Sequence, residues 1–142
     1  MKYLSGIVFI ISSALSMPLL AEEVAVIVNQ NNMQELTDSQ VNAVYTDQLT
    51  TWNNGQPIHV YQLPLSDNAR EVFSQRIMGQ SARRVERENA NRKITNSFEN
   101  PPLTKSAKLA LIYVSRDINA IAYVPLEMAR DKQGVRILLT LK

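Results

Sequence analysis

Four polar residues stand where the chain could bind an anion: Ser66, Asp67, Asn68 and Arg70. They follow a predicted strand at residues 57–63 and begin an amphipathic stretch at 67–78. The N–H groups in the first turn of a helix lack partners within the helix, so they attract negative charge. The hydroxyl and the guanidinium add donors, whereas the carboxylate of Asp67 opposes an anion. This spacing is typical of an oxyanion site, or equally of an ordinary helix capped by Ser66 or Asp67.

The other side chains with chemical potential offer no catalytic arrangement. His59 is the only histidine and the chain has no cysteine, so the ligand set of a zinc site is missing. We expect His59 at the surface or at a sheet edge. Trp52 could stack on a ligand, but a single tryptophan beside a turn is more typical of a core residue. Because no nucleophile–base spacing, paired carboxylates or Gly-rich phosphate loop is present, the sequence predicts no enzyme, no cofactor and no metal.

The elements that would position these residues alternate between strand and helix. Residues 24–28 form a continuous apolar run rich in valine, which is the pattern of a strand buried on both faces. Thr37-Asp38-Ser39 offers capping groups for a helix that carries Val41 on its apolar side. Asn53-Asn54-Gly55 predicts a turn, and the run at 57–63 predicts the next strand.

The downstream pattern completes a small α/β domain. The stretch 107–114 is apolar nearly all round, so we expect a buried helix there. Alternating strands and helices predict a three-layer α/β domain with a small, mostly parallel sheet flanked by helices. The expected elements are a helix at 67–78 ended by Gly79, a helix from Ser81 to Lys93, a loop at 94–102, a helix at 107–114, a strand at 120–124, a helical turn at 126–130 and a strand at 135–141.

The helix that begins at Ser81 is unusually basic. One interpretation is an ordinary solvent-exposed helix in which Glu86 and Glu88 partly balance the positive charge. Its sharper interpretation is a docking surface for an acidic partner or for anionic lipid headgroups. The basic residues are Arg83, Arg84, Arg87, Arg92 and Lys93.

The first 21 residues have the pattern of a secretory leader. Lys2 precedes an apolar centre, and Ala21 offers a small residue at the cleavage position. We therefore expect a signal peptide at 1–21, a single domain at 22–142 and a periplasmic location. The alternative is a retained membrane anchor, because the uncharged span is close to the shortest length that crosses a bilayer. The formal net charge of +2 gives no reason to expect nucleic acid as a partner.

Several segments together resemble the phosphate-binding subunits of ABC importers, which belong to the type II periplasmic binding proteins. The segments are VIVN, QELTDSQVNAVYTDQLTTWNNGQPI, SDNAREVF and NAIAYV, in that order along the chain. The resemblance covers nearly the whole mature chain but only one of the two lobes that such proteins have. It implies a single-lobe member of this fold that binds phosphate or a similar oxyanion. It also implies an ABC transporter permease, or a second copy of this chain, as the partner.

The resemblance places the ligand at Ser66, Asp67, Asn68 and Arg70, with departures from the family pattern. The family's matching loop carries Ser-Gly-Thr after an arginine on the strand. Here Ser66 keeps the hydroxyl, Asp67 and Asn68 replace Gly and Thr, and Gln62 replaces the arginine. A carboxylate at the positive end of a helix repels an anion. We therefore expect weak phosphate binding or none, and an interaction module that keeps the fold without the ligand is the alternative.

Overall fold

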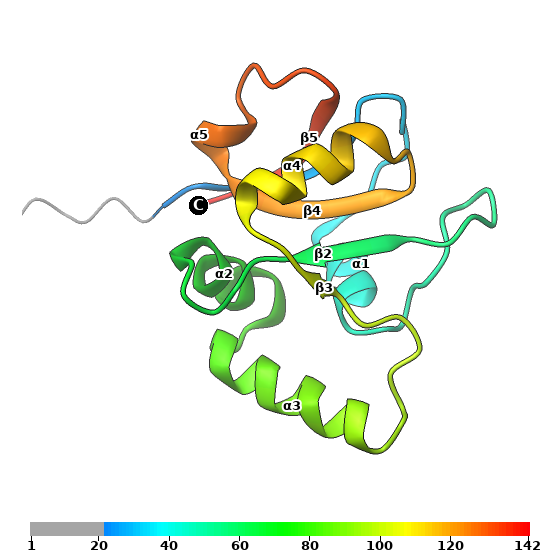
Figure 1. Ribbon diagram of the computed structural model, residues 1–142, viewed down its shortest axis with the longest axis vertical. Helices are drawn as coiled ribbons and strands as arrows, with labels where there is room; N and C mark the ends of the chain where they lie inside the picture. Colours follow the sequence, from blue (N-terminus) through cyan, green and yellow to red (C-terminus); the bar gives the residue numbers. More distant parts are fainter. Residues whose placement is uncertain (1–21) are drawn as a thin grey trace, which may run out of the picture.

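The computed structural model describes residues 22–142, so the predicted signal peptide lies outside the described residues. Strands and helices alternate along most of this part of the chain (Figure 1). The strands are β1 (Val24–Asn29), β2 (His59–Gln62), β3 (Leu103–Thr104), β4 (Ala120–Pro125) and β5 (Val135–Leu141). The helices are α1 (Asp38–Tyr45), α2 (Asn68–Phe73), the π-helix η1 (Ser74–Met78), α3 (Ala82–Ile94), α4 (Ala107–Arg116) and α5 (Leu126–Ala129).

The five strands form one open sheet in the order β3-β2-β4-β1-β5. The predicted strand at 24–28 is β1, and its residues from Val24 to Val28 are fully buried, as their apolar run indicated. Val26 faces Tyr123 of β4 on one side and Leu139 of β5 on the other. A strand with neighbours on both edges and helices over the sheet has no exposed surface, which explains why its apolar residues do not alternate with polar ones.

The sheet is mixed, which corrects the prediction of a mostly parallel one. β2 pairs in parallel with β3 and β4, whereas β1 pairs antiparallel with β4 and β5. Burial dictates the apolar content of a strand but carries no information about its direction. The connection from β1 to β2 is long enough for either direction, so the local pattern did not decide between them.

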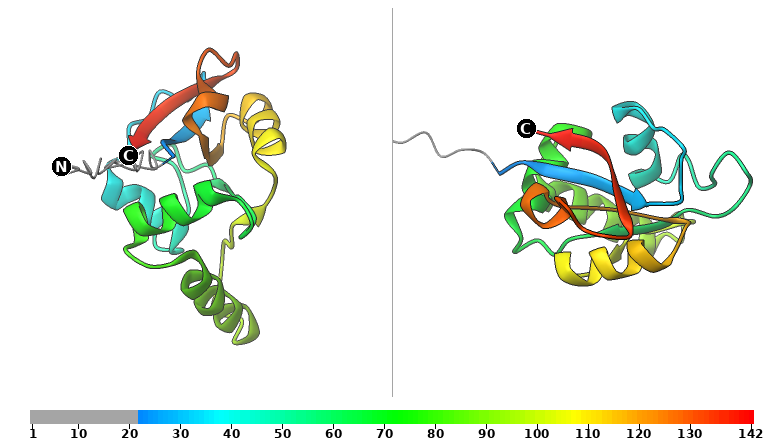
Figure 2. Two further views of the ribbon diagram at one scale, coloured as in Figure 1. Left: turned by 90° about the vertical axis from the view of Figure 1, so that its left-hand side faces the viewer. Right: turned by 90° about the horizontal axis from the view of Figure 1, so that it is seen from above.

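The layers around the sheet match the predicted three-layer arrangement. α4 covers one face of the sheet, and α1 and α2 cover the other (Figures 1 and 2). Aromatic rings fill the space under α1 and α2: Phe73 stacks on Tyr123 with ring centroids 3.9 Å apart, and Tyr45 meets Phe73 edge-on at 4.7 Å. α3 extends away from the sheet at one end of the molecule (Figure 1). No helix within residues 22–142 has the length and apolar character needed to cross a bilayer.

Two helices differ from their predicted form. The stretch 67–78 is helical and ends at Gly79 in the left-handed conformation, as expected, but its second half is the π-helix η1. α4 is not buried all round, because Leu109 and Tyr113 are 44% and 38% exposed. Only the face of α4 that contacts the sheet is covered in this small domain. Tyr113 instead stacks on Tyr61 with ring centroids 5.2 Å apart.

The helix caps follow the sequence signals. Thr37 caps α1 in a reciprocal capping box with Gln40, as the hydroxyl before Val41 indicated. Ser81 and Ser106 accept hydrogen bonds from backbone N–H groups at the beginnings of α3 and α4. Each cap satisfies one N–H group that the helix itself leaves free.

Candidate functional site

The predicted site residues lie at the edge of the sheet where β2 and β4 end and β1 begins. In open α/β sheets, ligands bind outside the carboxyl ends of the parallel strands. Two bonds connect the segments there. The N–H of Leu126 donates to the carbonyl of Glu23 at 2.9 Å, and the N–H of Leu63 donates to the hydroxyl of Tyr123 at 3.2 Å. These two hydrogen bonds fix the segments next to the four predicted residues at the carboxyl ends of β2 and β4.

The structure places these residues in different environments. Ser66 is exposed in the turn before α2. Asp67 is the N-cap of α2, and its Oδ1 accepts the N–H of Ala69 at 3.0 Å. Asn68 is exposed, and its Nδ2 donates to Oε2 of Glu22 at 3.2 Å. Of the two cap residues that the sequence left open, the structure selects Asp67, which leaves the Ser66 hydroxyl free to face solvent.

Ser66, Asp67 and Asn68 form a corner of the domain, at the turn between β2 and α2. Arg70 points into the protein rather than toward this corner. Its side chain is 3% exposed. One guanidinium nitrogen, Nη1, donates to the carbonyl of Leu63 at 3.2 Å, and the other, Nη2, donates to Oε2 of Glu86 at 2.6 Å. The guanidinium thus fastens α2 to α3 and to the loop after β2. Gln62, which stands where the resembled family has an arginine, is also buried and bonds to Oγ1 of Thr104 at 3.0 Å.

The charges around the corner do not favour an anion. The carboxylates of Glu22 and Asp67 lie beside Asn68 and Ser66, and Glu86 neutralises Arg70. Arg83 and Arg87 of α3 line a cavity of about 410 Å³ together with Glu86 and Leu65. These two arginines are exposed. The positive charge near the corner therefore comes from α3 rather than from the strand.

Two tyrosines beneath the corner stay neutral at ordinary pH. Burial raises the pKa of Tyr123 well above its usual value, and its hydroxyl accepts the N–H of Leu63. Burial also raises the pKa of Tyr45, with a smaller contribution from Tyr123. The hydroxyl of Tyr45 donates to the carbonyl of Tyr61 at 2.8 Å. Both hydroxyls thus satisfy buried backbone groups.

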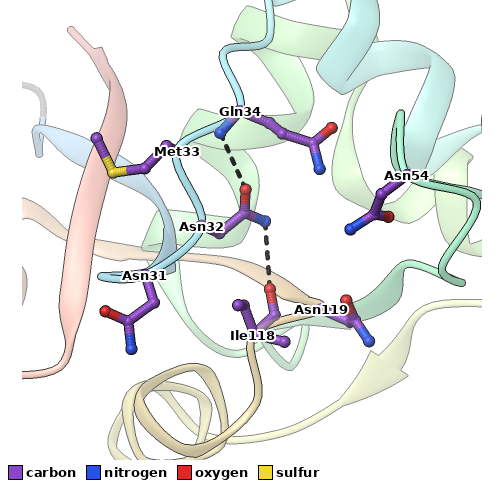
Figure 3. Close-up of a pocket in the computed structure, with 7 residues that line it drawn as sticks. All are labelled: Asn31, Asn32, Met33, Gln34, Asn54, Ile118 and Asn119. Atoms are coloured by element: carbon purple, nitrogen blue, oxygen red, sulfur yellow. Dashed lines mark hydrogen bonds between the residues drawn. The ribbon is translucent and has the colours of Figure 1, made fainter.

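Sequence reasoning missed a second cavity, which lies where β2 and β4 begin. Amide side chains contribute to its lining (Figure 3). Its lining comes from the loop after β1, the turn at Asn54 and the residues before β4. The available signal was the high density of Asn and Gln residues at 29–32 and 53–54. Nearby, Trp52 is buried and donates to the carbonyl of Asn119 at 3.0 Å, so it is a core residue, as expected.

The remaining candidates have structural roles. His59 is 46% exposed on the edge of the domain, and its Nδ1 lies 2.5 Å from Oδ2 of Asp117. This confirms its expected position at the surface. Within residues 22–142, no group of three or more His, Cys, Asp and Glu side chains is arranged to hold a metal ion.

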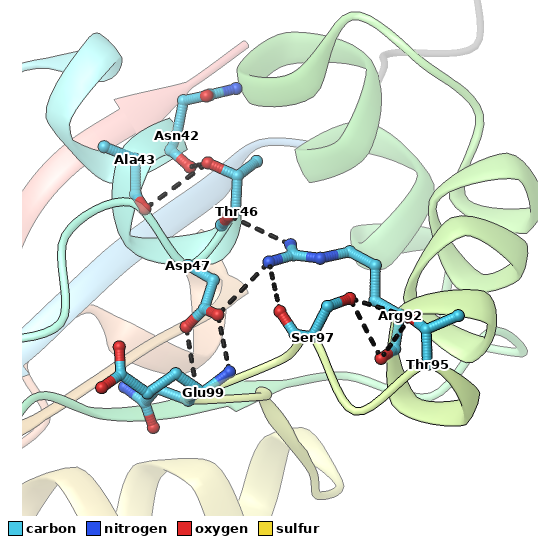
Figure 4. Close-up of polar contacts among 9 residues, drawn as sticks. Asn42, Ala43, Thr46, Asp47, Arg92, Thr95, Ser97 and Glu99 are labelled. Atoms are coloured by element: carbon cyan, nitrogen blue, oxygen red, sulfur yellow. Dashed lines mark hydrogen bonds and ion pairs between the residues drawn. The ribbon is translucent and has the colours of Figure 1, made fainter.

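The basic helix α3 is anchored at its far end by a buried carboxylate (Figure 4). The Asp47 side chain is 4% exposed. It accepts the N–H groups of Glu99 and Asn100 at 2.7 and 2.8 Å and Nη2 of Arg92 at 3.2 Å. The guanidinium of Arg92 also lies 4.2 Å from the ring centre of Phe98. One of the basic residues of α3 is thus used within the fold, while Arg83, Arg87 and Lys93 remain exposed.

Comparison with known proteins identifies the family. The model of the PBP superfamily domain matches residues 11–138. The chain belongs to the PBP superfamily. This confirms the resemblance to periplasmic binding proteins, and membership of this superfamily supports a solute-binding role. No curated protein matches the chain.

Solved structures share the fold of this PBP-superfamily chain. A phosphate transport receptor of ABC type from Vibrio cholerae matches with a TM-score of 0.62 at 20% identity, over 82% of this chain and 45% of the receptor. A possible phosphate binding protein from Planctomyces limnophilus matches at 0.61 and 13% identity, over 83% and 42%. A putative phosphate ABC transporter substrate-binding protein from Clostridium perfringens, with bound phosphate, matches at 0.56 and 18% identity, over 84% and 55%. The chain spans about half the length of each, which confirms the predicted single lobe.

Proposed function

We propose that this protein is an exported, non-enzymatic, single-lobe solute-binding protein for phosphate or a similar oxyanion, acting with an ABC-type transporter. The observation that carries the proposal is the match of a PBP superfamily domain to residues 11–138, together with the similar fold of the phosphate receptor and phosphate-binding proteins compared above. Export rests on the leader pattern of residues 1–21. A second copy of the chain or a transporter subunit supplies the other side of the ligand site.

The ligand contacts in this proposal are the hydroxyl of Ser66 and the backbone N–H of Asn68, with Asp67 shaping the turn. Ser66 and Asn68 are exposed at the carboxyl edge of β2. The N–H of Asn68 has no hydrogen-bond partner among residues 22–142. Arg70 contributes positive charge from one turn inside the helix, although Glu86 offsets most of it.

The expected affinity of the lone lobe is low. Micromolar binding requires about 8 kcal/mol. A few charge-assisted hydrogen bonds of about 1.5–3 kcal/mol each reach this value only before the costs of desolvation and of immobilising the ligand. An anion on a single lobe also stays in contact with water, where each contact is weaker. We therefore expect a dissociation constant in the millimolar range or above.

Isothermal titration of the purified protein with sodium phosphate tests this proposal. Binding in the millimolar range that Ser66→Ala weakens, while Ser39→Ala on the exposed side of α1 leaves it unchanged, would support the corner as the site. Micromolar affinity of the monomer would contradict the expectation that a single lobe binds its anion weakly because the anion stays in contact with water. Absence of any thermal stabilisation at about 100 mM phosphate would show that the ligand has been lost.

The internal pairing of Arg70 with Glu86 favours a second candidate, an interaction module that has kept the fold and lost the ligand. In this alternative, the exposed arginines of α3 bind an acidic partner at the cell envelope. Replacing Arg83, Arg84 and Arg87 by Ala should then abolish capture of the partner while the protein stays folded. Retention of capture by this variant would exclude α3 as the docking surface.

A further inference from the structure

A cavity lies at the amino ends of β2 and β4, at the opposite end of these strands from Ser66. Figure 3 shows the residues that line it. The cavity measures about 270 Å³. We infer that it is a binding site for a neutral, hydroxyl-rich ligand such as a sugar ring. The polar side chains that line it are all carboxamides: Asn31, Asn32, Gln34, Asn54 and Asn119.

The loop after β1 is held in place before any ligand arrives. Asn32 is 5% exposed, and its Nδ2 donates to the carbonyl of Ile118 at 3.2 Å while its Oδ1 accepts the N–H of Gln34 at 3.0 Å. The guanidinium of Arg136 donates to the carbonyls of Asn32 and Gln34 at 2.7 and 2.8 Å. A site whose loop is already ordered loses less conformational entropy on binding.

The free polar groups around the cavity are mainly donors. The side-chain carbonyl oxygens of Gln34 and Asn54 already accept backbone N–H groups at 2.9 and 3.1 Å. Their NH₂ groups therefore remain available, and the two amides point toward one another from separate loops (Figure 3). Within residues 22–142, the side chains of Asn31 and Asn119 make no hydrogen bond, so each offers both a donor and an acceptor. This set matches hydroxyl groups, which both donate and accept.

The surroundings favour a neutral ligand over an ion. Among residues 22–142, no charged side chain lines the cavity, and the nearby Arg136 is paired with Glu35 at 2.9 Å. A bound anion would therefore lack a counter-charge inside the cavity. Met33 and Ile118, which also line the cavity, are 73% and 52% exposed. Such apolar side chains can cover the C–H face of a sugar ring, while the amides bind its hydroxyls.

The test is a titration of the ¹⁵N-labelled protein with glucose and with N-acetylglucosamine, followed through the side-chain NH₂ resonances of Asn and Gln. We expect the signals of Asn54 and Asn119 to shift with a common, saturable dependence on sugar concentration. Asn119→Ala removes a carboxamide that makes no hydrogen bond within residues 22–142, so both its donor and its acceptor are lost without a cost to the fold. This variant should therefore fold normally and bind sugar about three- to tenfold more weakly, as expected for the loss of one or two neutral hydrogen bonds.

The matched control is Asn91→Ala, at an exposed position of α3, which should leave the titration unchanged. Three results would overturn the inference. The first is no shift of these resonances by either sugar up to about 100 mM, where even a millimolar site would be nearly saturated. The second is equal sugar affinity in Asn119→Ala and wild type. The third is a shift of the same resonances by phosphate but not by sugar, which would make this an oxyanion site.

Discussion

Glu86 should stabilise the protein far more than its exposure suggests. Its side chain is 46% exposed, yet its partner Arg70 is only 3% exposed. Substituting Glu86 by Ala leaves a buried guanidinium whose remaining bond is to the carbonyl of Leu63. Removing one partner of a buried ion pair typically costs about 3–5 kcal/mol. Because that carbonyl stays and water can enter where the carboxylate was, we expect about 2–3 kcal/mol for Glu86→Ala.

A neighbouring residue provides a matched control on the same helix. Glu88 is 53% exposed and pairs with Arg84, which is itself 65% exposed, at 3.4 Å. An exposed pair of this spacing is worth about 0.3–0.5 kcal/mol, so Glu88→Ala should change stability by no more than this. The two glutamates differ mainly in the burial of their partners, so the comparison isolates the desolvated guanidinium.

Urea denaturation followed by the fluorescence of Trp52 measures both variants. Trp52 is the only tryptophan and it is buried, so its emission reports the loss of the core. With a slope of about 1.5 kcal/mol/M, a loss of about 2–3 kcal/mol lowers the midpoint by roughly 1.3–2 M. Equal midpoints for Glu86→Ala and Glu88→Ala would refute the reasoning, because they would show that the guanidinium of Arg70 does not depend on its carboxylate.

Further predictions concern the other buried polar groups and the charge at the corner. Hydrogen bonds from the side chain of Gln75 and, to a smaller extent, from the N–H of Ala82 lower the pKa of Glu71 in the folded protein. Glu71 therefore adds to the free energy of unfolding above its pKa in the unfolded chain, and this contribution is lost as the pH falls through its pKa in the folded protein. Glu71→Gln should therefore flatten the acid limb of the thermal-stability profile below about pH 4.3. Burial raises the pKa of Tyr45 and Tyr123, so stability should be intact below about pH 10 and fall as the pH rises beyond it, measured by urea midpoints against Tyr45→Phe. Asp47→Ala removes three hydrogen bonds at a residue with φ 69° and should cost about 2–4 kcal/mol in urea denaturation. Glu22→Gln removes a carboxylate beside the corner and should tighten phosphate binding about two- to fivefold by calorimetry.

The sequence was most informative where one local interaction decides the structure. The apolar run of β1 predicted burial because no other environment suits five adjacent aliphatic residues. Thr37 and Ser81 predicted helix beginnings because their hydroxyls accept backbone N–H groups three residues later. Gly79 predicted a helix end because glycine readily adopts the left-handed conformation that ends the helix. Such signals depend only on neighbours along the chain, so they could be interpreted without the fold.

The sequence was least informative where partners are distant along the chain. The pairing of Arg70 with Glu86 joins two residue types that are usually exposed, and nothing in their local patterns predicts it. The direction of β1 depends on which strands pair with it, not on its composition. The exposed side of α4 was also not predictable from local pattern. Apolar residues around a helix favour burial on every side, but in this domain only the sheet packs against α4.

The amide-lined cavity was missed for a related reason. Its side chains come from three segments, around Asn32, Asn54 and Asn119, which meet only when β1 and β2 both pair with β4. Amide-rich segments are ordinarily read as turns, and here they do form turns. The same residues that end strands and shape loops also line the cavity, so only the folded arrangement shows the second use.

The charges at the two edges of the sheet argue for different kinds of ligand. At the carboxyl edge, Glu22 and Asp67 oppose an anion and Arg70 is already neutralised. Tight oxyanion binding there requires positive charge and exclusion of water by a second surface, as in a dimer or a complex with a transporter subunit. At the amino edge, the donors around Asn54 and Asn119 carry no net charge and need no such help for a neutral ligand. Phosphate affinity should therefore depend on assembly, whereas sugar affinity should be the same in the monomer and in any complex.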